Sequence, residues 1–249
     1  MSNAAIDINC DLGEGIGNEA AIMPFISSVN IACGFHAGSP LTMQETVNLA
    51  KKHQVAVGAH PSYPDREHFG RRTMHLPANE IYAMVVYQVG AMAAVCKAEK
   101  TKLHHIKLHG ALYNQAAVDR VIADAFVAAI KDFDASLKIY GLSGSVLISL
   151  AKAAGIRAVE EAFADRSYTP EGRLTSRSMP HAMHTDPAEV TAQALSIALR
   201  NTVRATDQSI LQLNAETLCI HGDGLHAQAF AKAVYNSMLE NNIRIQSPA

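Results

Sequence analysis

Four histidines stand beside glycines at the ends of short apolar runs. The runs are IACGFH at Ile31–His36, VAVGAH at Val55–His60, IKLHG at Ile106–Gly110 and LCIHG at Leu218–Gly222. A short apolar run bounded by turn residues is typical of a strand that is buried on both faces, as in a parallel sheet. Because active sites of α/β folds lie at the carboxyl ends of their strands, imidazoles repeated at this position predict an enzyme.

Two carboxylates follow the first of the predicted strands. Asp11 and Glu14 lie in the motif NCDLGEG, and paired carboxylates at a strand end suit general-base chemistry or metal ligation. Asp11, His36 and His60 make a set of one carboxylate and two imidazoles, which is sufficient for zinc, iron or manganese. Their spacing is not a metal signature, so the same groups equally suit proton transfer without a metal.

A lysine and a histidine lie two residues apart in the fourth unit. Lys107 and His109 are expected to share one face of a strand. A lysine that points into a barrel needs an anion beside it, which makes Lys107 a candidate electrophile or substrate anchor. In the sixth strand, either Glu160 or Glu161 must face the interior, because adjacent strand residues point to opposite faces.

Further charged residues are candidates for binding the substrate. His221 and Asp223 are expected to pair, with His221 either as a base or as a structural partner. The segment PSYPDREHFGRR, which follows His60, supplies Asp65, which is expected to pair with Arg66. It also supplies the cation Arg71.

A long segment without a clear helix or strand pattern spans about 164–186. Its sequence ADRSYTPEGRLTSRSMPHAMHTD includes Arg166 and Arg177. Loops of this length within one domain are usually functional lids or disordered segments. The segment is therefore either a solvated surface loop or a basic flap over an anionic substrate, since guanidinium groups bind carboxylate and phosphate in bidentate fashion.

Strand and helix patterns alternate along the whole chain. The predicted strands are Ala5–Cys10, Val29–Cys33, Val55–Ala59, His105–Leu108, Leu137–Gly141, Ile156–Ala162 and Thr217–His221. The predicted helices are Pro40–His53, Ala78–Lys100, Val118–Lys131, Ser145–Ala154, Pro187–Arg204 and Leu225–Asn241. Seven such units without a linker predict one α/β domain over residues 1–249. They favour a TIM-like (β/α) barrel with seven strands over an open doubly wound sheet.

The composition is that of an ordinary soluble protein. Of the 249 residues, 49% are hydrophobic and 18% are charged, with a net charge of −2, which favours neither nucleic acid nor a membrane as a partner. The start of the chain lacks a signal-peptide pattern, and no run approaches the ~20 apolar residues that a membrane span needs, so we expect a cytoplasmic protein. The four cysteines are scattered, as buried thiols in a reducing compartment are. The sequence contains neither a GxxxxGK[ST] phosphate loop nor a nucleophile elbow.

Motifs along essentially the whole chain resemble those of the LamB/YcsF family. They are NCDLGEG, NIACGFHAG, GAHPSYPD, FGRR, KLHGALYN, EAFADRSY and HGD. The chain departs from the family pattern at Ser39, His68, Leu108 and His181, whereas the carboxylates and strand-end histidines named above are all present. The resemblance implies a seven-stranded TIM-like barrel related to glycoside hydrolase and deacetylase barrels.

The resemblance also implies an activity. The characterised function of the family is that of the A subunit of bacterial 5-oxoprolinase. With the B and C subunits it opens the lactam of 5-oxo-L-proline to L-glutamate and hydrolyses ATP. ATP with Mg²⁺ is then expected as a co-substrate, whereas a permanent metal and a homo-oligomer both stay open. The catalytic candidates are Asp11, Glu14, His36, His60, Lys107 and His109. The substrate-binding candidates are Asp65, Arg71, Arg166, Arg177, His221 and Asp223.

Two other interpretations of the same residues remain open. The first is a metal-dependent amidohydrolase or deacetylase that acts alone, with Asp11, His36 and His60 as ligands. The second is a non-catalytic protein of the same complex that binds an intermediate for its partners.

Overall fold

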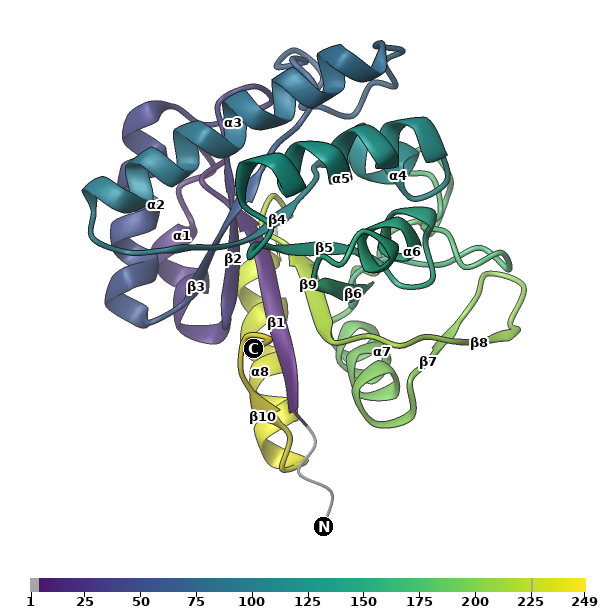
Figure 1. Ribbon diagram of the computed structural model, residues 1–249. Helices are drawn as coiled ribbons and strands as arrows, with labels where there is room; N and C mark the ends of the chain where they lie inside the picture. The colour runs from purple at the N-terminus through teal and green to yellow at the C-terminus, as the bar shows by residue number, and fades with distance from the viewer. Residues whose placement is uncertain (1–4, 225) are drawn as a thin grey trace.

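Seven parallel strands close into a barrel in the computed structural model, which describes residues 5–224 and 226–249 (Figure 1). They are β1 (Ala5–Leu12), β2 (Ser28–Ala32), β3 (Ala56–His60), β4 (Leu103–Lys107), β5 (Lys138–Leu142), β6 (Ala158–Phe163) and β9 (Thr217–His221). Neighbouring strands follow this order, and β9 pairs with β1 to close the ring. The predicted seven-stranded barrel is confirmed.

Strand β1 closes the barrel, because it pairs with the last barrel strand on one side and with the second strand on the other. Its residues Asp7–Asp11 pair with β9, and Asn9–Leu12 pair with β2. The start of β1 also pairs with the short strand β10 (Arg244–Ile245), so the first and the last described strands lie side by side (Figure 1). Because all seven strands of the barrel are parallel, their carboxyl ends meet at one end of it.

Helices surround the barrel between successive strands. They are α1 (Glu19–Ile22), the 3₁₀ helix η1 (Met23–Phe25), α2 (Pro40–His53), α3 (Ala78–Ala98), α4 (Gly110–Ala116), α5 (Arg120–Asp134), α6 (Val146–Ala153), α7 (Pro187–Arg200) and α8 (Ala227–Glu240). Helix α2 begins as its sequence predicts, because the Ser39 hydroxyl accepts the Thr42 amide proton and Pro40 occupies the first turn. Asp119, Ser145 and Asp186 cap α5, α6 and α7 in the same way.

Several predicted helix boundaries were wrong. The helix predicted at Val118–Lys131 is α5, which begins only after the Asp119 cap, and a separate helix α4 precedes it. The helix predicted at Pro187–Arg204 ends at Arg200, because Asn201 adopts a left-handed conformation with φ of 54°. The chain then forms an antiparallel hairpin of β7 (Thr202–Arg204) and β8 (Ile210–Gln212). The predicted start of the last helix, Leu225, lies outside the described residues.

Helix α3 has 21 residues and is long and apolar enough to span a membrane by length and composition, contrary to the expectation from the sequence. One side of the helix is buried, with Ile81, Val85, Val89 and Met92 inaccessible to solvent, and it packs against α5 and α2. These contacts are those of a core helix.

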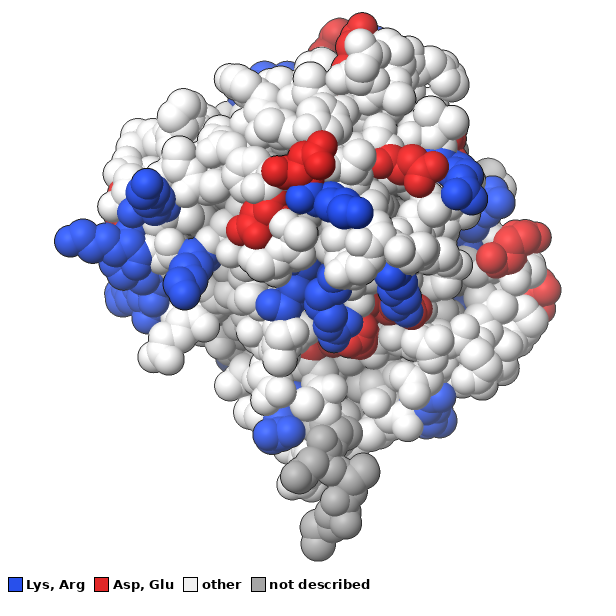
Figure 2. All heavy atoms as spheres, in the orientation of Figure 1, with Lys and Arg blue, Asp and Glu red and all other residues white. Residues whose placement is uncertain are grey.

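On the face of the molecule in Figure 2, basic and acidic side chains are interspersed among uncharged ones.

The inside of the barrel is polar, whereas the layer between strands and helices is apolar. Asn9 donates to both Glu161 Oε1 and Thr217 Oγ1 at 2.8 Å. Asn30 donates to Asn9 Oδ1 at 2.7 Å, and His105 Nε2 lies 2.8 Å from Asn30 Oδ1. These hydrogen bonds connect neighbouring strands and strands separated by one other, and they fix the polar side chains just below the candidate site.

Candidate active site

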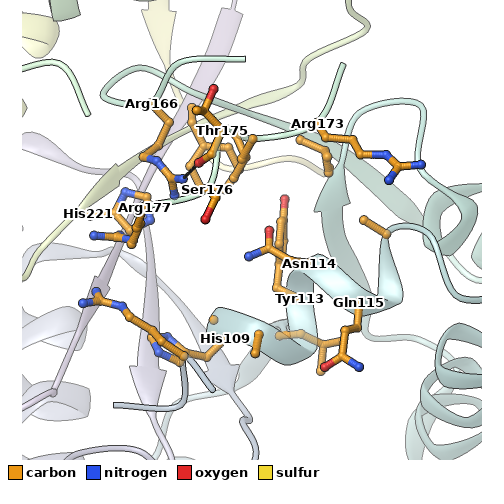
Figure 3. Close-up of a pocket in the computed structure, with 18 of the residues that line it drawn as sticks. His109, Tyr113, Asn114, Gln115, Arg166, Arg173, Thr175, Ser176, Arg177 and His221 are labelled. Atoms are coloured by element: carbon orange, nitrogen blue, oxygen red, sulfur yellow. Dashed lines mark hydrogen bonds between the residues drawn. The ribbon is translucent and has the colours of Figure 1, made fainter. Parts of the chain in front are cut away.

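A cavity of about 570 Å³ opens at the carboxyl ends of the strands (Figure 3). Asp11, His60, Lys107, His109 and His221 line its barrel side. The opposite side is formed by the segment 164–186, which contributes Arg166, Arg173, Leu174, Thr175, Ser176, Arg177 and Ser178. The long segment, for which the sequence left a solvated surface loop and a basic flap open, therefore forms one wall of the cavity, and we call it the flap.

An ion cluster lies at the barrel end of the cavity. Lys107 Nζ is 2.9 Å from Asp11 Oδ1 and 2.8 Å from Glu161 Oε1. It also lies 3.1 Å from Asn9 Oδ1 and 3.0 Å from Cys219 Sγ. Three ammonium protons are thus matched by three oxygen acceptors. Lys107 in this geometry fixes Asp11, and it would have to release an acceptor to serve as an electrophile.

Electrostatics keep this pair ionised. Burial opposes the charge on Asp11, but His60 and Lys107 outweigh it and hold the Asp11 pKa well below its usual value. Burial also opposes the charge on Lys107, and Asp11 leads the groups that nevertheless raise the Lys107 pKa well above normal. Asp11 Oδ2 remains directed toward His60 Nε2 at 3.4 Å. A carboxylate that its neighbours hold in the ionised form therefore lines the cavity.

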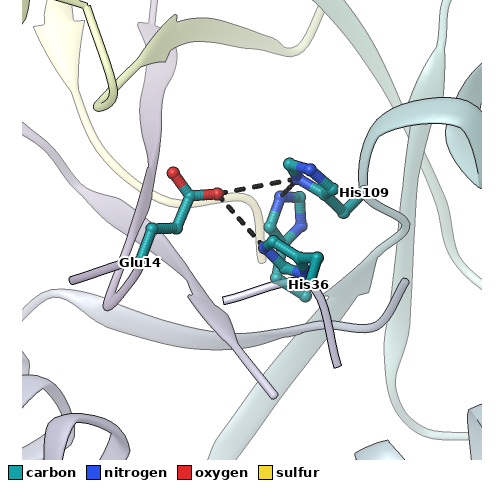
Figure 4. A group of neighbouring side chains, drawn as sticks. Glu14, His36 and His109 are labelled. Atoms are coloured by element: carbon teal, nitrogen blue, oxygen red, sulfur yellow. Dashed lines mark hydrogen bonds and ion pairs between the residues drawn. The ribbon is translucent and has the colours of Figure 1, made fainter. Parts of the chain in front are cut away.

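Three imidazoles and one carboxylate gather beside Asp11, and we call them the histidine cluster: Glu14, His36, His60 and His109 (Figure 4). His60 Nε2 and His109 Nδ1 are 2.9 Å apart, and the His36 and His109 rings stack with centroids 3.7 Å apart. Glu14 Oε1 lies 3.3 Å from His36 Nε2 and 3.6 Å from His109 Nδ1. The strand-end histidines expected from the sequence converge as predicted, except His221.

The loop after β3 fixes two of these rings. Phe69 has a positive φ of 54°, and its ring contacts His36 and His109 edge-on. A side chain at Gly70 would lie 2.8 Å from His109 and 2.9 Å from His36, so only glycine allows the loop to approach the rings this closely. The strained backbone at Phe69 is consistent with a functional loop.

Burial keeps two of the cluster histidines neutral. It lowers the pKa values of His36 and His109 well below their usual value, and the charge of neighbouring imidazoles lowers them further. Burial raises the Glu14 pKa well above its normal value, with the charge of Asp11 adding to the effect. The metal set suggested by the sequence thus changes: Glu14 and His109 join His36 and His60, whereas Asp11 pairs with Lys107.

Cations lie around the mouth of the cavity. Arg71, whose side chain is 34% exposed, forms an ion pair with Asp223. Arg177 is exposed and points into the cavity from the flap (Figure 3). Arg166 is buried instead, and its guanidinium donates to the carbonyls of Thr175 and Ala182. Arg166 therefore shapes the flap, while Arg71 and Arg177 face the open space.

Two expected pairings were wrong. His221 Nδ1 lies 3.0 Å from Asp165 Oδ2, which also accepts the His221 backbone N–H, whereas Asp223 pairs with Arg71. Asp65 pairs with His68 and with Arg72 instead of Arg66, whose guanidinium donates to backbone carbonyls. Asp65 is not among the residues that line the cavity. Its contact with substrate stays a prediction.

Sequence reasoning did not single out Asn9, Asn30, Ser62 or Asp165. Asn9 and Asn30 stand in the middle of strand runs, at positions that alternate with buried apolar residues. A polar residue at such a position is a detectable signal of a polar barrel interior. Ser62 and Asp165 lie in loops and act through contacts with residues far along the chain, for which the sequence offers no comparable signal.

Comparisons with known proteins agree with the motifs. The model of the LamB/YcsF family matches residues 6–249. The 5-oxoprolinase A subunits of Bordetella parapertussis and Tolumonas auensis are each 49% identical to this chain, covering 98% of it and 99% of their own length.

Solved structures agree as well. The lactam utilization protein of Thermus thermophilus has 44% identity and a TM-score of 0.92, covering 98% of this chain and 100% of its own. A putative cellobiose-phosphate cleavage protein of Enterococcus faecalis, at 12% identity and a TM-score of 0.57 over 99% of this chain and 98% of its own, shares the fold alone. With its family motifs, its seven-stranded barrel and a match over nearly its full length, this chain belongs to the LamB/YcsF family.

Proposed function

We propose that this chain is the A subunit of an ATP-dependent 5-oxoprolinase and that it acts together with the B and C subunits. The reaction would convert 5-oxo-L-proline, ATP and two waters to L-glutamate, ADP and phosphate. Support comes from the names of relatives that are 49% identical over nearly the full length. The observation that carries the proposal on the structural side is the ionised Asp11 facing a cavity with cations at its mouth.

The chemistry of the lactam explains why ATP is needed. A five-membered lactam is a stabilised amide, and phosphorylation of its oxygen makes the ring carbon more electrophilic. Addition of a first water to that carbon, followed by cleavage of the C–N bond, gives an acyl phosphate and a free amine. A second water then releases phosphate and leaves the γ-carboxylate of glutamate. Each addition of water needs a base, and ring opening needs a proton for the nitrogen.

The residues at the cavity suit these steps. Asp11 Oδ2 would accept the proton of the attacking water, because Oδ1 is already engaged by Lys107 and Asn30. Lys107 would keep Asp11 ionised and add positive potential near the developing oxyanion. Asp11, once it has accepted that proton, would pass it to the leaving nitrogen as the ring opens.

The anionic parts of the substrate would bind at the mouth of the cavity. Arg71 and Arg177 would hold the 5-oxoproline carboxylate or the phosphate in bidentate fashion. His221, held by Asp165, would donate a further hydrogen bond from the opposite ring nitrogen. ATP with Mg²⁺ would be the co-substrate, and a cytoplasmic location would give access to it.

Reconstitution tests this proposal. The three proteins, this chain with the B and C subunits, are purified separately and mixed with 5-oxoproline and ATP. Glutamate and ADP should form in equal amounts only when all three proteins are present. Full conversion by the B and C subunits without this chain would contradict the proposal.

The histidine cluster favours one second candidate, a metal-dependent amidohydrolase that acts alone. The same assay separates the two functions. Lactam hydrolysis by this chain without ATP and without the two partner proteins would support the second candidate instead of the first.

A further inference from the structure

We propose that the histidine cluster binds one divalent transition-metal ion, with Zn²⁺ as the best match. The donor atoms would be Glu14 Oε1, His36 Nε2, His60 Nε2 and His109 Nδ1. All four lie within 4.8 Å of one another and are buried. The inference concerns ion binding and stands independently of the lactam reaction proposed above.

The hydrogen bonds of His60 and His109 determine which ring nitrogens carry protons. His60 Nδ1 lies 2.8 Å from the Lys107 carbonyl, and His109 Nε2 lies 2.9 Å from the Phe69 carbonyl. Carbonyl oxygens only accept, so each of these nitrogens must be the N–H of its ring. In the neutral tautomers, His60 Nε2 and His109 Nδ1 are both bare, yet they face each other at 2.9 Å.

His36 has the same arrangement through a hydroxyl group. Its Nδ1 lies 2.8 Å from Ser62 Oγ, and the Ser62 hydroxyl donates its one proton to the Tyr63 carbonyl at 3.0 Å. Ser62 Oγ therefore accepts from His36 Nδ1–H, and His36 Nε2 is bare. The cluster thus directs three unprotonated nitrogens and a carboxylate oxygen at one point. Anchoring of the distal N–H is the usual arrangement for histidines that bind a metal.

A proton explains this arrangement less well than a metal ion. A single proton on Glu14 would satisfy His36 Nε2 at 3.3 Å, but it would leave the two facing nitrogens of His60 and His109 without a donor. A proton between those two rings, with Asp11 Oδ2 3.4 Å from His60 Nε2 to balance its charge, would account for that contact alone, and a second proton on Glu14 would be needed for His36 Nε2. A divalent ion satisfies all four donor atoms at once.

The separations of the donor atoms fit a small ion. Tetrahedral zinc with bonds of about 2.0–2.1 Å places its ligand atoms roughly 3.3–3.5 Å apart. Three of the observed separations, 2.9, 3.3 and 3.6 Å, bracket that value, and all separations lie within 4.8 Å, so small shifts of the side chains would complete the site. Because the His36 and His109 rings now stack at 4°, ion binding should tilt them toward each other and weaken the stacking. Three imidazoles with one carboxylate suit Zn²⁺ and, less tightly, Fe²⁺ or Mn²⁺.

Metal binding is measured directly on the full chain. The purified protein is stripped with a chelator, loaded with Zn²⁺ or Co²⁺, freed of excess ion and analysed by elemental mass spectrometry. We expect about one ion per chain, and Co²⁺ should give the intense visible absorption of a tetrahedral site. Less than about a tenth of an ion per chain in the wild-type protein would overturn the proposal.

Variants localise the ion to the cluster. The double variant His36→Ala/His109→Ala should lose stoichiometric binding, whereas His53→Ala, on the exposed end of α2, should bind as the wild type does. Ser62→Ala keeps all four ligands and removes only the anchor of His36, so it should weaken Zn²⁺ binding by about 10–100-fold. It serves as the test if the double variant fails to fold.

Unchanged stoichiometry in the double variant, or unchanged affinity in Ser62→Ala, would contradict the site. Neither measurement uses lactam, ATP or the partner proteins. A protein that binds Zn²⁺ but fails in reconstitution would refute the proposed function alone, and an active protein without bound metal would refute only the ion site.

Discussion

Lys107 on β4 reaches across the barrel to Asp11 on β1, with Nζ 2.9 Å from Oδ1. Glu161 on β6 completes the contact at 2.8 Å, so one buried ammonium links three strands that do not adjoin one another. Removing one partner of a buried ion pair leaves the other charge without compensation, which is far more costly than the net gain from forming the pair. This contact therefore connects the stability of the barrel to the state of the candidate catalytic carboxylate.

Replacing Lys107 by methionine should destabilise the protein strongly. The variant keeps the length of the side chain but leaves Asp11 and Glu161 as neighbouring buried carboxylates. We expect the free energy of unfolding to fall by about 3–5 kcal/mol, measured by urea denaturation at pH 7. The added substitution Asp11→Asn should recover part of this loss, because it removes one of the two uncompensated charges. A Lys107→Met protein as stable as the wild type would contradict the ion cluster.

Glu160 and Glu161 offer a matched pair for activity measurements. Glu161 faces Lys107 and accepts the Tyr113 hydroxyl proton at 2.7 Å, whereas Glu160 faces outward to Lys152. Glu161→Gln should lower kcat by about tenfold or more, because Lys107 loses an anionic partner and Asp11 loses its fixed position. Glu160→Gln should leave kcat and KM unchanged in the reconstituted assay. If the two substitutions lowered kcat equally, the contact of Glu161 with Lys107 inside the barrel would have no specific role in catalysis.

Gly58 on β3 makes room for the His105 ring inside the barrel. A Cβ at this position would lie 2.2 Å from His105 Nε2, and the ring cannot move away easily because it stacks on Tyr140 at 4.0 Å. Gly58→Ala should lower the free energy of unfolding by about 1–3 kcal/mol or more. Gly90→Ala on α3 is the control, since its nearest neighbour would be 3.8 Å away, and it should stabilise the helix by about 0.5–1 kcal/mol. Thermal and urea unfolding of both variants measure the contrast.

Asp7 lies at the opposite end of the barrel from the cavity, and its raised pKa should make the free energy of unfolding depend on pH. Burial raises its pKa from 3.8 to about 6, although Ser27 and Thr217 donate hydrogen bonds to it. Because the folded state binds this proton more tightly than the unfolded state, the contribution of Asp7 to stability is present below about pH 4 and is lost as the pH rises through about 6.

The variant Asp7→Asn removes that titration. Its free energy of unfolding, taken relative to that of the wild type, should increase by about 2 kcal/mol between pH 4.5 and pH 8. Urea denaturation of both proteins at several pH values measures the difference and cancels the contribution of all other groups. A difference that does not change with pH would show that Asp7 titrates normally.

The barrel and most of its site could be predicted from the sequence, because both follow from local patterns. Apolar runs that end at glycine and histidine marked the strands, and the parallel arrangement then required His36, His60 and His109 to meet at one end. The same reasoning required one of Glu160 and Glu161 to face the interior. Each of these inferences depends only on the period of a strand and on the common direction of the strands.

The errors concern contacts between loops that are distant in sequence. His221 was expected to pair with its neighbour Asp223, but the loop after β6 brings Asp165 closer, and Arg71 takes Asp223. Arg166 lines the cavity but donates to carbonyls of the flap, so its expected contact with substrate stays a prediction. Charge and spacing identified these residues as important. The choice of partner depended on the path of each loop, which no local pattern determines.

The most direct test of the account is the rate of ATP-coupled glutamate release by Asp11→Asn in the reconstituted assay with the B and C subunits. The variant removes the base, and its folding is checked by circular dichroism. The account predicts a decrease in kcat of about 10²–10⁴-fold. The matched variant Glu160→Gln, on the outer face of the barrel, should keep full activity. A folded Asp11→Asn protein with near wild-type kcat would contradict the assignment of Asp11 as the catalytic base.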